Sequence, residues 1–266
     1  MGMPPLFASL KTGWSRASDS NSGLIAAGIA YYGFLALVPM LAAAFLTYGL
    51  VVEPATIAEH GSSLTRTLPG AAGELVAGQL ENIAARNTGD SRFGLLIAIA
   101  LALFGARVAA GALITAIDMA FTVQDERGFI ASNLLALVIT SGAVLALGLM
   151  AGITTLVATV LAGSIGAFAS YVLIGLAGFG GAFLAYRVVP QRKIVGRGAA
   201  MRGSGLFALG WLTASAAFGF YASNFGNYNA TYGSLGAVIV FLTWLWLSAF
   251  LLLLGAHVAA ASTQRP

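Results

Sequence analysis

Arg107 is the residue whose chemistry fits its surroundings least, because it interrupts an apolar stretch that runs from about Phe93 to Phe121. A cation near the middle of a membrane helix costs at least about 2.5–3.5 kcal/mol and has to face protein, water or a carboxylate. Asp118 lies on nearly the same helical face, but about 16 Å further along the axis, which excludes a direct pair. The pattern predicts either a polar path from the midplane to one membrane surface or a structural Arg bonded to carbonyls of a broken neighbouring helix.

His257 is the second candidate, at the end of the last apolar stretch and at a depth similar to that of Asp118. A hydrogen bond between the imidazole and the Asp118 carboxylate is therefore predicted, and a plain interfacial His is the alternative. The only other His, His60, belongs to a different loop, so no metal site is expected. We expect no cofactor either, because the glycine-rich stretches lack the sequence of a phosphate-binding loop.

Pro39 lies in the middle of the first apolar stretch and removes one backbone hydrogen bond there. We expect a kink at Pro39, which makes it a candidate hinge, with Tyr31 and Tyr32 lining a cavity beside it. The alternative is that these residues are the ordinary Pro and interfacial aromatic residues of membrane helices.

The composition identifies an integral membrane protein. Of the 266 residues, 59% are hydrophobic and only 8% are charged, too few to cover the surface of a water-soluble globule of this size. The absence of Cys excludes disulfides and thiolate metal sites.

Hydropathy predicts an all-α fold with six transmembrane helices. A cytoplasmic segment, 1–22, with a short interfacial helix near Leu6 to Trp14, precedes the membrane domain, 23–262, and a tail, 263–266, follows it. A helix break is expected at Gly163 to Gly166. The polar region 53–92 carries an amphipathic pattern, so a helical periplasmic cap is expected between helices 1 and 2. The expected spans are 24–52, 93–121, 131–161, 167–189, 203–223 and 234–261.

The positive charges predict the orientation. With six spans, nine Lys and Arg residues fall on the side of the two termini and three fall on the other side. Both termini are therefore expected in the cytoplasm.

The basic loop 187–202 holds five of these charges, and we expect it to contact anionic lipid headgroups. A nucleic-acid partner is not expected, because the same side lacks a cluster of carboxylates or a His/Lys acid–base set for RNA hydrolysis. Glycine-rich helix faces suggest close helix packing and a homo-oligomer as a possible partner. The candidate headgroup contacts are Arg187, Arg192, Lys193, Arg197 and Arg202.

Three segments carry a family resemblance. The first span reads AAGIAYYGFLALVPML, the second ends in ALITAIDMAF before QDERGF, and the last contains YGSLGA and LLGA. Over about residues 20–262 the chain resembles the YihY/virulence factor BrkB family of bacterial inner-membrane proteins. The resemblance implies a multi-pass inner-membrane protein with six spans; members are linked to virulence or envelope lipids, and a ribonuclease label on some is regarded as mistaken. In the family, LLGA is usually followed by Glu, where this chain has His257, and Asn is common where it has Asp118.

The favoured function is movement of a lipid-like or other amphipathic small molecule, a cargo that the sequence does not identify. The supports are the midplane Arg107, the expected break in the first helix and the envelope-linked relatives. The alternative is a non-catalytic scaffold for envelope machinery. An enzyme is not expected, because no nucleophile and base are visible as a set.

Overall fold

The computed structural model describes residues 5–51, 88–123, 127–161, 163–190, 195–225 and 234–263, and every regular element in these ranges is a helix. The chain divides into two compact units. Unit 1 contains Met1–Tyr31 and Arg107–Pro266, and unit 2 contains Tyr32–Ala106. Most of the expected periplasmic cap, residues 53–87, lies outside the described residues.

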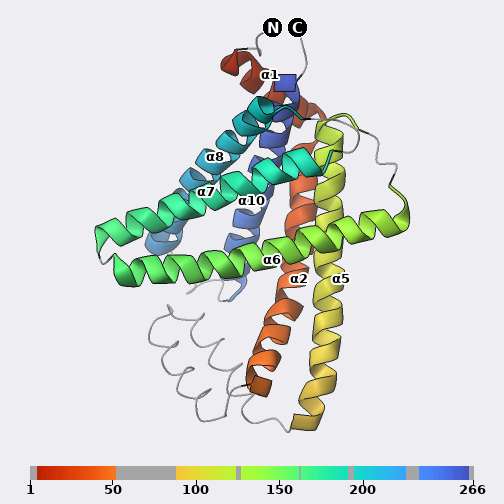
Figure 1. The fold of residues 1–266 in the computed structure, drawn as a ribbon, viewed down its shortest axis with the longest axis vertical. Coiled ribbons are helices and arrows are strands. Elements are labelled where there is room, and N and C mark those ends of the chain that lie inside the picture. Colours follow the sequence, from red (N-terminus) through yellow and green to blue (C-terminus); the bar gives the residue numbers. More distant parts are fainter. Residues whose placement is uncertain are drawn as a thin grey trace. The chain divides into compact units, whose positions relative to one another are not determined.

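Apart from α1, the described helices fall on the apolar stretches of the sequence, and Figure 1 shows them in chain order. Within the described residues, three segments are long and apolar enough to cross a membrane: Ser164–Val188, Arg197–Phe220 and Val238–Thr263. This confirms the all-helical membrane class, while the number of six spans remains a prediction. The helices are α1 (Leu6–Asp19), α2 (Ser22–Val51), α5 (Thr88–Ala120), α6 (Phe129–Val160), α7 (Ser164–Val188), α8 (Arg197–Phe225) and α10 (Ser234–Thr263).

The turn between α6 and α7 lies where the sequence places it. Gly163 has a φ of 74° and directly precedes α7, a conformation that costs glycine little and other residues much. The uncharged stretch 128–186 is therefore divided into two helices at the predicted position.

Helix α2 is continuous from Ser22 to Val51, close to the expected span 24–52, and Pro39 lies in its interior. A proline removes one backbone hydrogen bond, and a helix can tolerate that loss when the turns on both sides hold. A kinked helix is still one continuous helix, so the kink and the hinge at Pro39 stay predictions. In unit 2, Gly105 of α5 lies against Ala36 of α2, where an added Cβ would approach the Ala36 Cα to 2.9 Å.

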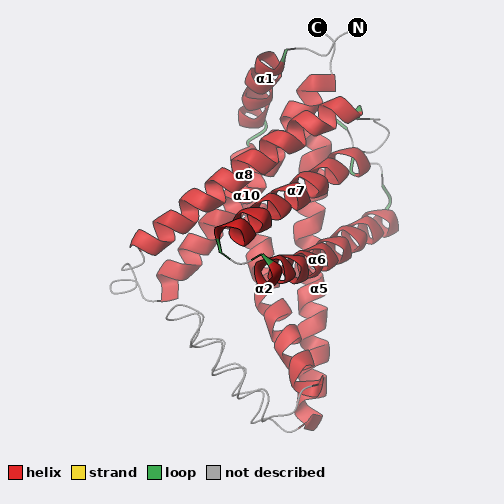
Figure 2. Ribbon diagram, turned by 60° about the vertical axis from the view of Figure 1, so that its left-hand side comes forward, coloured by secondary structure: helices red, strands yellow, loops and turns green. Residues whose placement is uncertain are grey.

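In unit 1, α10 packs against both α1 and α8, and α7 packs against α8 and α6. Helices α8 and α10 run side by side in Figures 1 and 2. Two indole N–H groups join them in opposite directions: Trp211 donates to Ser248 Oγ at 3.0 Å, and Trp244 donates to Ser215 Oγ at 3.1 Å. Such bonds between helices give membrane packing its specificity.

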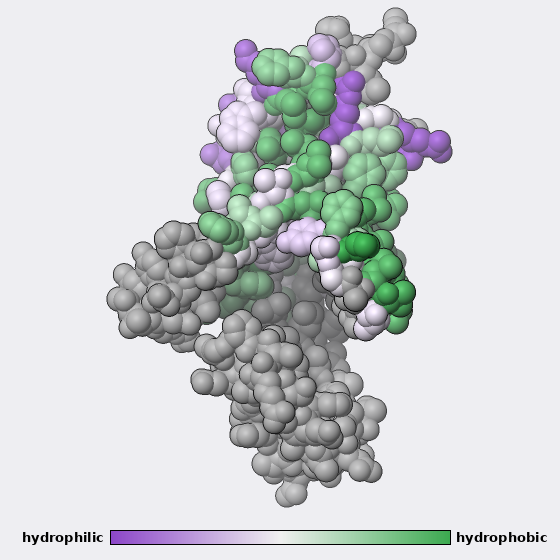
Figure 3. Space-filling model, turned by 90° about the vertical axis from the view of Figure 1, so that its left-hand side faces the viewer, coloured by the Kyte–Doolittle hydropathy of each residue, from purple (hydrophilic) through white to green (hydrophobic). Residues whose placement is uncertain are grey.

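Alanine is the commonest buried apolar residue of unit 1, and many large apolar side chains face outward. On α7, for example, Gly175 and Ala182 are buried, whereas Phe168 and Leu184 are exposed. Figure 3 shows one face on which apolar residues cover much of the described surface and hydrophilic residues gather toward the end with the termini. Lipid removes the penalty for exposed apolar side chains, and small interior residues let helix backbones approach closely.

Candidate functional site

Arg107 lines a pocket between α5 and the start of α6. Its Nε donates a hydrogen bond to Asn133 Oδ1, so the guanidinium is tied to α6. The pocket has a volume of about 190 Å³ and combines two polar side chains of α6 with small apolar positions on both helices. Its lining residues are Arg107, Val108, Gly111, Ala112, Ser132, Asn133 and Ala136.

Sequence reasoning placed Arg107 on a protein-facing surface but did not name its partner. The expected surroundings were protein, water or a carboxylate, with carbonyls of a broken neighbouring helix as the structural alternative. The sequence contains one indication of this partner, because Asn133 is the only amide side chain in the uncharged stretch 128–186. A lone amide in an apolar stretch has to find a hydrogen-bond partner, and an interrupting Arg on the preceding helix is a matching donor.

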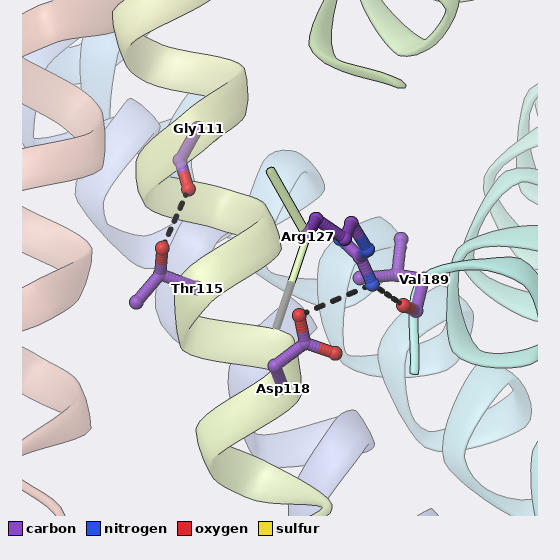
Figure 4. A network of polar contacts seen from close by, with 5 residues as sticks. All are labelled: Gly111, Thr115, Asp118, Arg127 and Val189. Atoms are coloured by element: carbon purple, nitrogen blue, oxygen red, sulfur yellow. Dashed lines mark hydrogen bonds and ion pairs between the residues drawn. The ribbon is translucent and has the colours of Figure 1, made fainter. Parts of the chain in front are cut away.

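A buried ion pair holds the end of α5, as Figure 4 shows. Arg127 Nη2 lies 3.3 Å from Asp118 Oδ2, and the two side chains are 7% and 2% exposed. The same Nη2 donates to the carbonyl oxygen of Val189, the residue that follows α7. One guanidinium therefore joins the end of α5, the segment before α6 and the end of α7.

His257 has different partners from those expected. Its Nε2 lies 3.1 Å from both Ser20 Oγ and Ser22 Oγ, which are 2.9 Å apart, at the turn between α1 and α2. Among the described residues, Nδ1 has no hydrogen-bond partner. The predicted Asp118–His257 hydrogen bond is thus absent, because each side chain points to another neighbour: Asp118 to Arg127, and His257 to the two serines.

The remaining candidates are spread over the surface. Tyr31 and Tyr32 are 54% and 41% exposed. Arg187 is exposed, with its guanidinium carbon 5.7 Å from the Phe183 ring centre. Arg197 begins α8, and Arg202 is half-buried one turn later. Arg192 and Lys193 lie outside the described residues.

The contacts between α5 and the next segment form a seam, which we define as the Arg107–Asn133 and Asp118–Arg127 pairs with the pocket beside the first of them. On α5, between Arg107 and Asp118, the Thr115 hydroxyl donates a hydrogen bond to the Gly111 carbonyl oxygen at 3.0 Å (Figure 4). Arg107 is the cation that lines this pocket, and a guanidinium matches the oxygens of carboxylates and phosphates. The seam has the chemistry to hold an anionic group at its pocket.

Comparisons with known proteins agree with the membrane class. A family model described as Virulence factor BrkB matches residues 14–266. The ribonuclease-like protein YfkH of Bacillus subtilis is 27% identical over 96% of this chain and 95% of its own length. A UPF0761 membrane protein of Nitrosospira multiformis is 38% identical, but over only 28% of this chain and 17% of that protein. No solved structure matches the chain.

Proposed function

Because the chain belongs to the virulence factor BrkB family, we propose that it is a bacterial inner-membrane protein that transports or otherwise handles a lipid-like or amphipathic small molecule. The observation that carries this proposal is the pocket at Arg107. A cation in an apolar stretch is costly, and such residues usually mark binding sites or pathways.

The size of the pocket narrows the ligand chemistry. A volume of about 190 Å³ is below the roughly 300–1,000 Å³ of sites that enclose a drug-sized ligand. The pocket therefore suits the anionic head of a larger amphipathic molecule, with its apolar part lying along the exposed apolar helix surface. The Arg107 guanidinium supplies charge, and Ser132 and Asn133 supply polar groups beside it.

The first test compares Arg107→Ala and Arg107→Lys in protein purified from membranes and washed at high salt, with phosphatidylglycerol retained by the protein as the measured quantity. Salt screens exposed charges far more than partly buried ones. We expect Arg107→Ala to lose most of the retained lipid and Arg107→Lys to lose less, because Lys keeps the charge but not the planar fork.

Asp19→Asn is the control, since it removes one exposed charge on α1, which is not part of the pocket lining, and it should leave retention at high salt unchanged. Asn133→Ala tests the same pocket without a change of charge and should weaken retention. If the Arg107 and Asn133 variants fold and keep all their lipid, the transport proposal fails and the scaffold alternative gains. If Arg107→Ala does not assemble, Asn133→Ala and Arg107→Lys decide by the same readout.

A ribonuclease activity, suggested by the printed name of YfkH alone, is not part of the proposal. RNA hydrolysis needs metal-binding carboxylates or an acid–base pair. Asp118 is engaged with Arg127, and His257 Nε2 with two serines. We therefore propose a non-enzymatic role.

We also propose that both termini and the loop 187–202 face the cytoplasm and that residues 53–92 lie outside. The support is the unequal count of positive residues on the two sides. The chain has no Cys, so Ser63→Cys creates a single labelling site. A membrane-impermeant maleimide should label it from the outside in intact cells; labelling only from the cytoplasmic side would refute this orientation.

A further inference from the structure

Helix α1 has three distinct faces, and the first of them is packed against α10. Ser9, Gly13 and Ala17 are buried on this face and recur every four residues. A Cβ on Gly13 would lie 2.5 Å from Val258 Cγ2, so the two backbones approach closely. Next to this contact, Ser20 bonds to His257, which fixes the end of α1 on the same helix.

The second face of α1 is apolar and exposed. Phe7 is 80% exposed, Trp14 is 60% and Leu6 is 53%. With Leu10, which is half-buried, these residues fall within about 100° of arc on a helix of 3.6 residues per turn. Lys11, Ser15 and Asp19 are exposed on the third, polar face.

Aromatic rings continue the apolar face of α1 onto α10. The Trp14 ring meets Phe250 edge-on at 6.1 Å, and Phe250 stacks on Trp246 at 5.8 Å. The Trp246 indole then donates to the Gly23 carbonyl of α2 at 2.9 Å. Phe250 and Trp246 belong to the apolar segment Val238–Thr263, which is long enough to cross a membrane. Lipid that surrounds this segment therefore also reaches the apolar face of α1.

The charges of α1 fit the same surroundings. Lys11 borders the apolar face next to Phe7 on a helix of 3.6 residues per turn. Basic residues that flank the apolar face of an amphipathic helix are attracted to anionic headgroups, and their long side chains can extend to the membrane surface.

From these observations we propose that α1 is an in-plane membrane helix, docked on α10 through its small residues, whose face of Leu6, Phe7, Leu10 and Trp14 is inserted among the phospholipids of one leaflet. The occupant of this face is lipid, with anionic headgroups at Lys11. The inference does not depend on the function proposed above.

The absence of Cys again makes the test direct, because Phe7→Cys and Ser15→Cys each give one labelling site, on the apolar and the polar face of the same helix. Each variant of the full chain is labelled with an environment-sensitive fluorophore and placed in phosphatidylglycerol-containing nanodiscs with nitroxide-labelled acyl chains. We expect a blue-shifted emission and several-fold stronger quenching at position 7 than at position 15.

Equal, weak quenching at both positions would overturn the proposal. A second result would also overturn it: the label at position 7 is shielded from lipid, and unlabelled Phe7→Cys forms disulfides between copies. The apolar face would then be an interface between two copies of the chain. Leu6→Cys provides a second site on the apolar face if Phe7→Cys does not fold. An additional Lys11→Glu change in the Phe7→Cys chain should reduce the quenching in phosphatidylglycerol discs more than in phosphatidylcholine discs.

Discussion

Replacing Asp118 by Asn is expected to lower the free energy of unfolding by about 3–5 kcal/mol, the usual cost of removing one partner of a buried ion pair. The change leaves the Arg127 guanidinium, with a side chain only 7% exposed, without its carboxylate. Arg127 also donates to the Val189 carbonyl, so a shift of its side chain would disturb the contact with the end of α7 as well. Denaturant titration of the purified protein in detergent micelles measures the change.

Two further variants make this prediction specific. Asp19→Asn removes an exposed carboxylate whose described contact is Ser15 Oγ at 3.5 Å, and it should change stability by no more than about 0.5 kcal/mol. The double variant Asp118→Leu with Arg127→Met should recover much of the loss, since it leaves no buried charge. If Asp118→Asn is as stable as Asp19→Asn, the buried pair does not hold the end of α5.

The positions of the helices follow from the sequence because local signals agree there. Apolar stretches end at charged or polar segments or at Gly163, and the helices begin and end within a few residues of those signals. The effect of Pro39 was not predictable in the same way. Whether a proline interrupts a helix depends on how the neighbouring turns are held, and that is set by packing and not by the residue itself.

For the candidate site, the sequence predicts which side chains are costly to bury, but not which residues they contact. Burying a charge is expensive, so the sequence indicates that Arg107 needs protein or water around it. It does not identify Asn133, because the residue on α6 that faces Arg107 depends on how the two helices cross. The Asp118–His257 prediction failed for the same reason: similar depth along two helices does not make two side chains face each other. Arg127 was counted only as a loop charge, although it follows α5 closely enough to reach back to Asp118.

The LLGA motif that carried the family resemblance is explained here by packing. Gly255 of this motif lies where an added Cβ would be 2.5 Å from the Tyr186 Oη and 2.7 Å from the Gly203 carbonyl oxygen. Tyr186 is fully buried and donates a hydrogen bond of 2.6 Å to the carbonyl of Leu252, the residue directly before the motif. Helices α7, α8 and α10 therefore meet at one point, where side chains larger than hydrogen do not fit.

Replacing Gly203 by Ala is therefore expected to destabilise the protein by about 1–3 kcal/mol, the usual cost of overpacking a tight interior. The new methyl would collide with the Gly255 carbonyl oxygen and lie 2.9 Å from the Ala259 Cβ. A backbone oxygen cannot turn aside as a side chain can, so α8 and α10 would have to separate.

Gly205→Ala, two residues along the same helix, is the matched control, because its Cβ would meet nothing within 4 Å. It should be neutral or stabilise the helix by up to about 1 kcal/mol. The same denaturant titration compares the two variants, and equal stability would show that α8 and α10 do not depend on the close approach of Gly203 and Gly255.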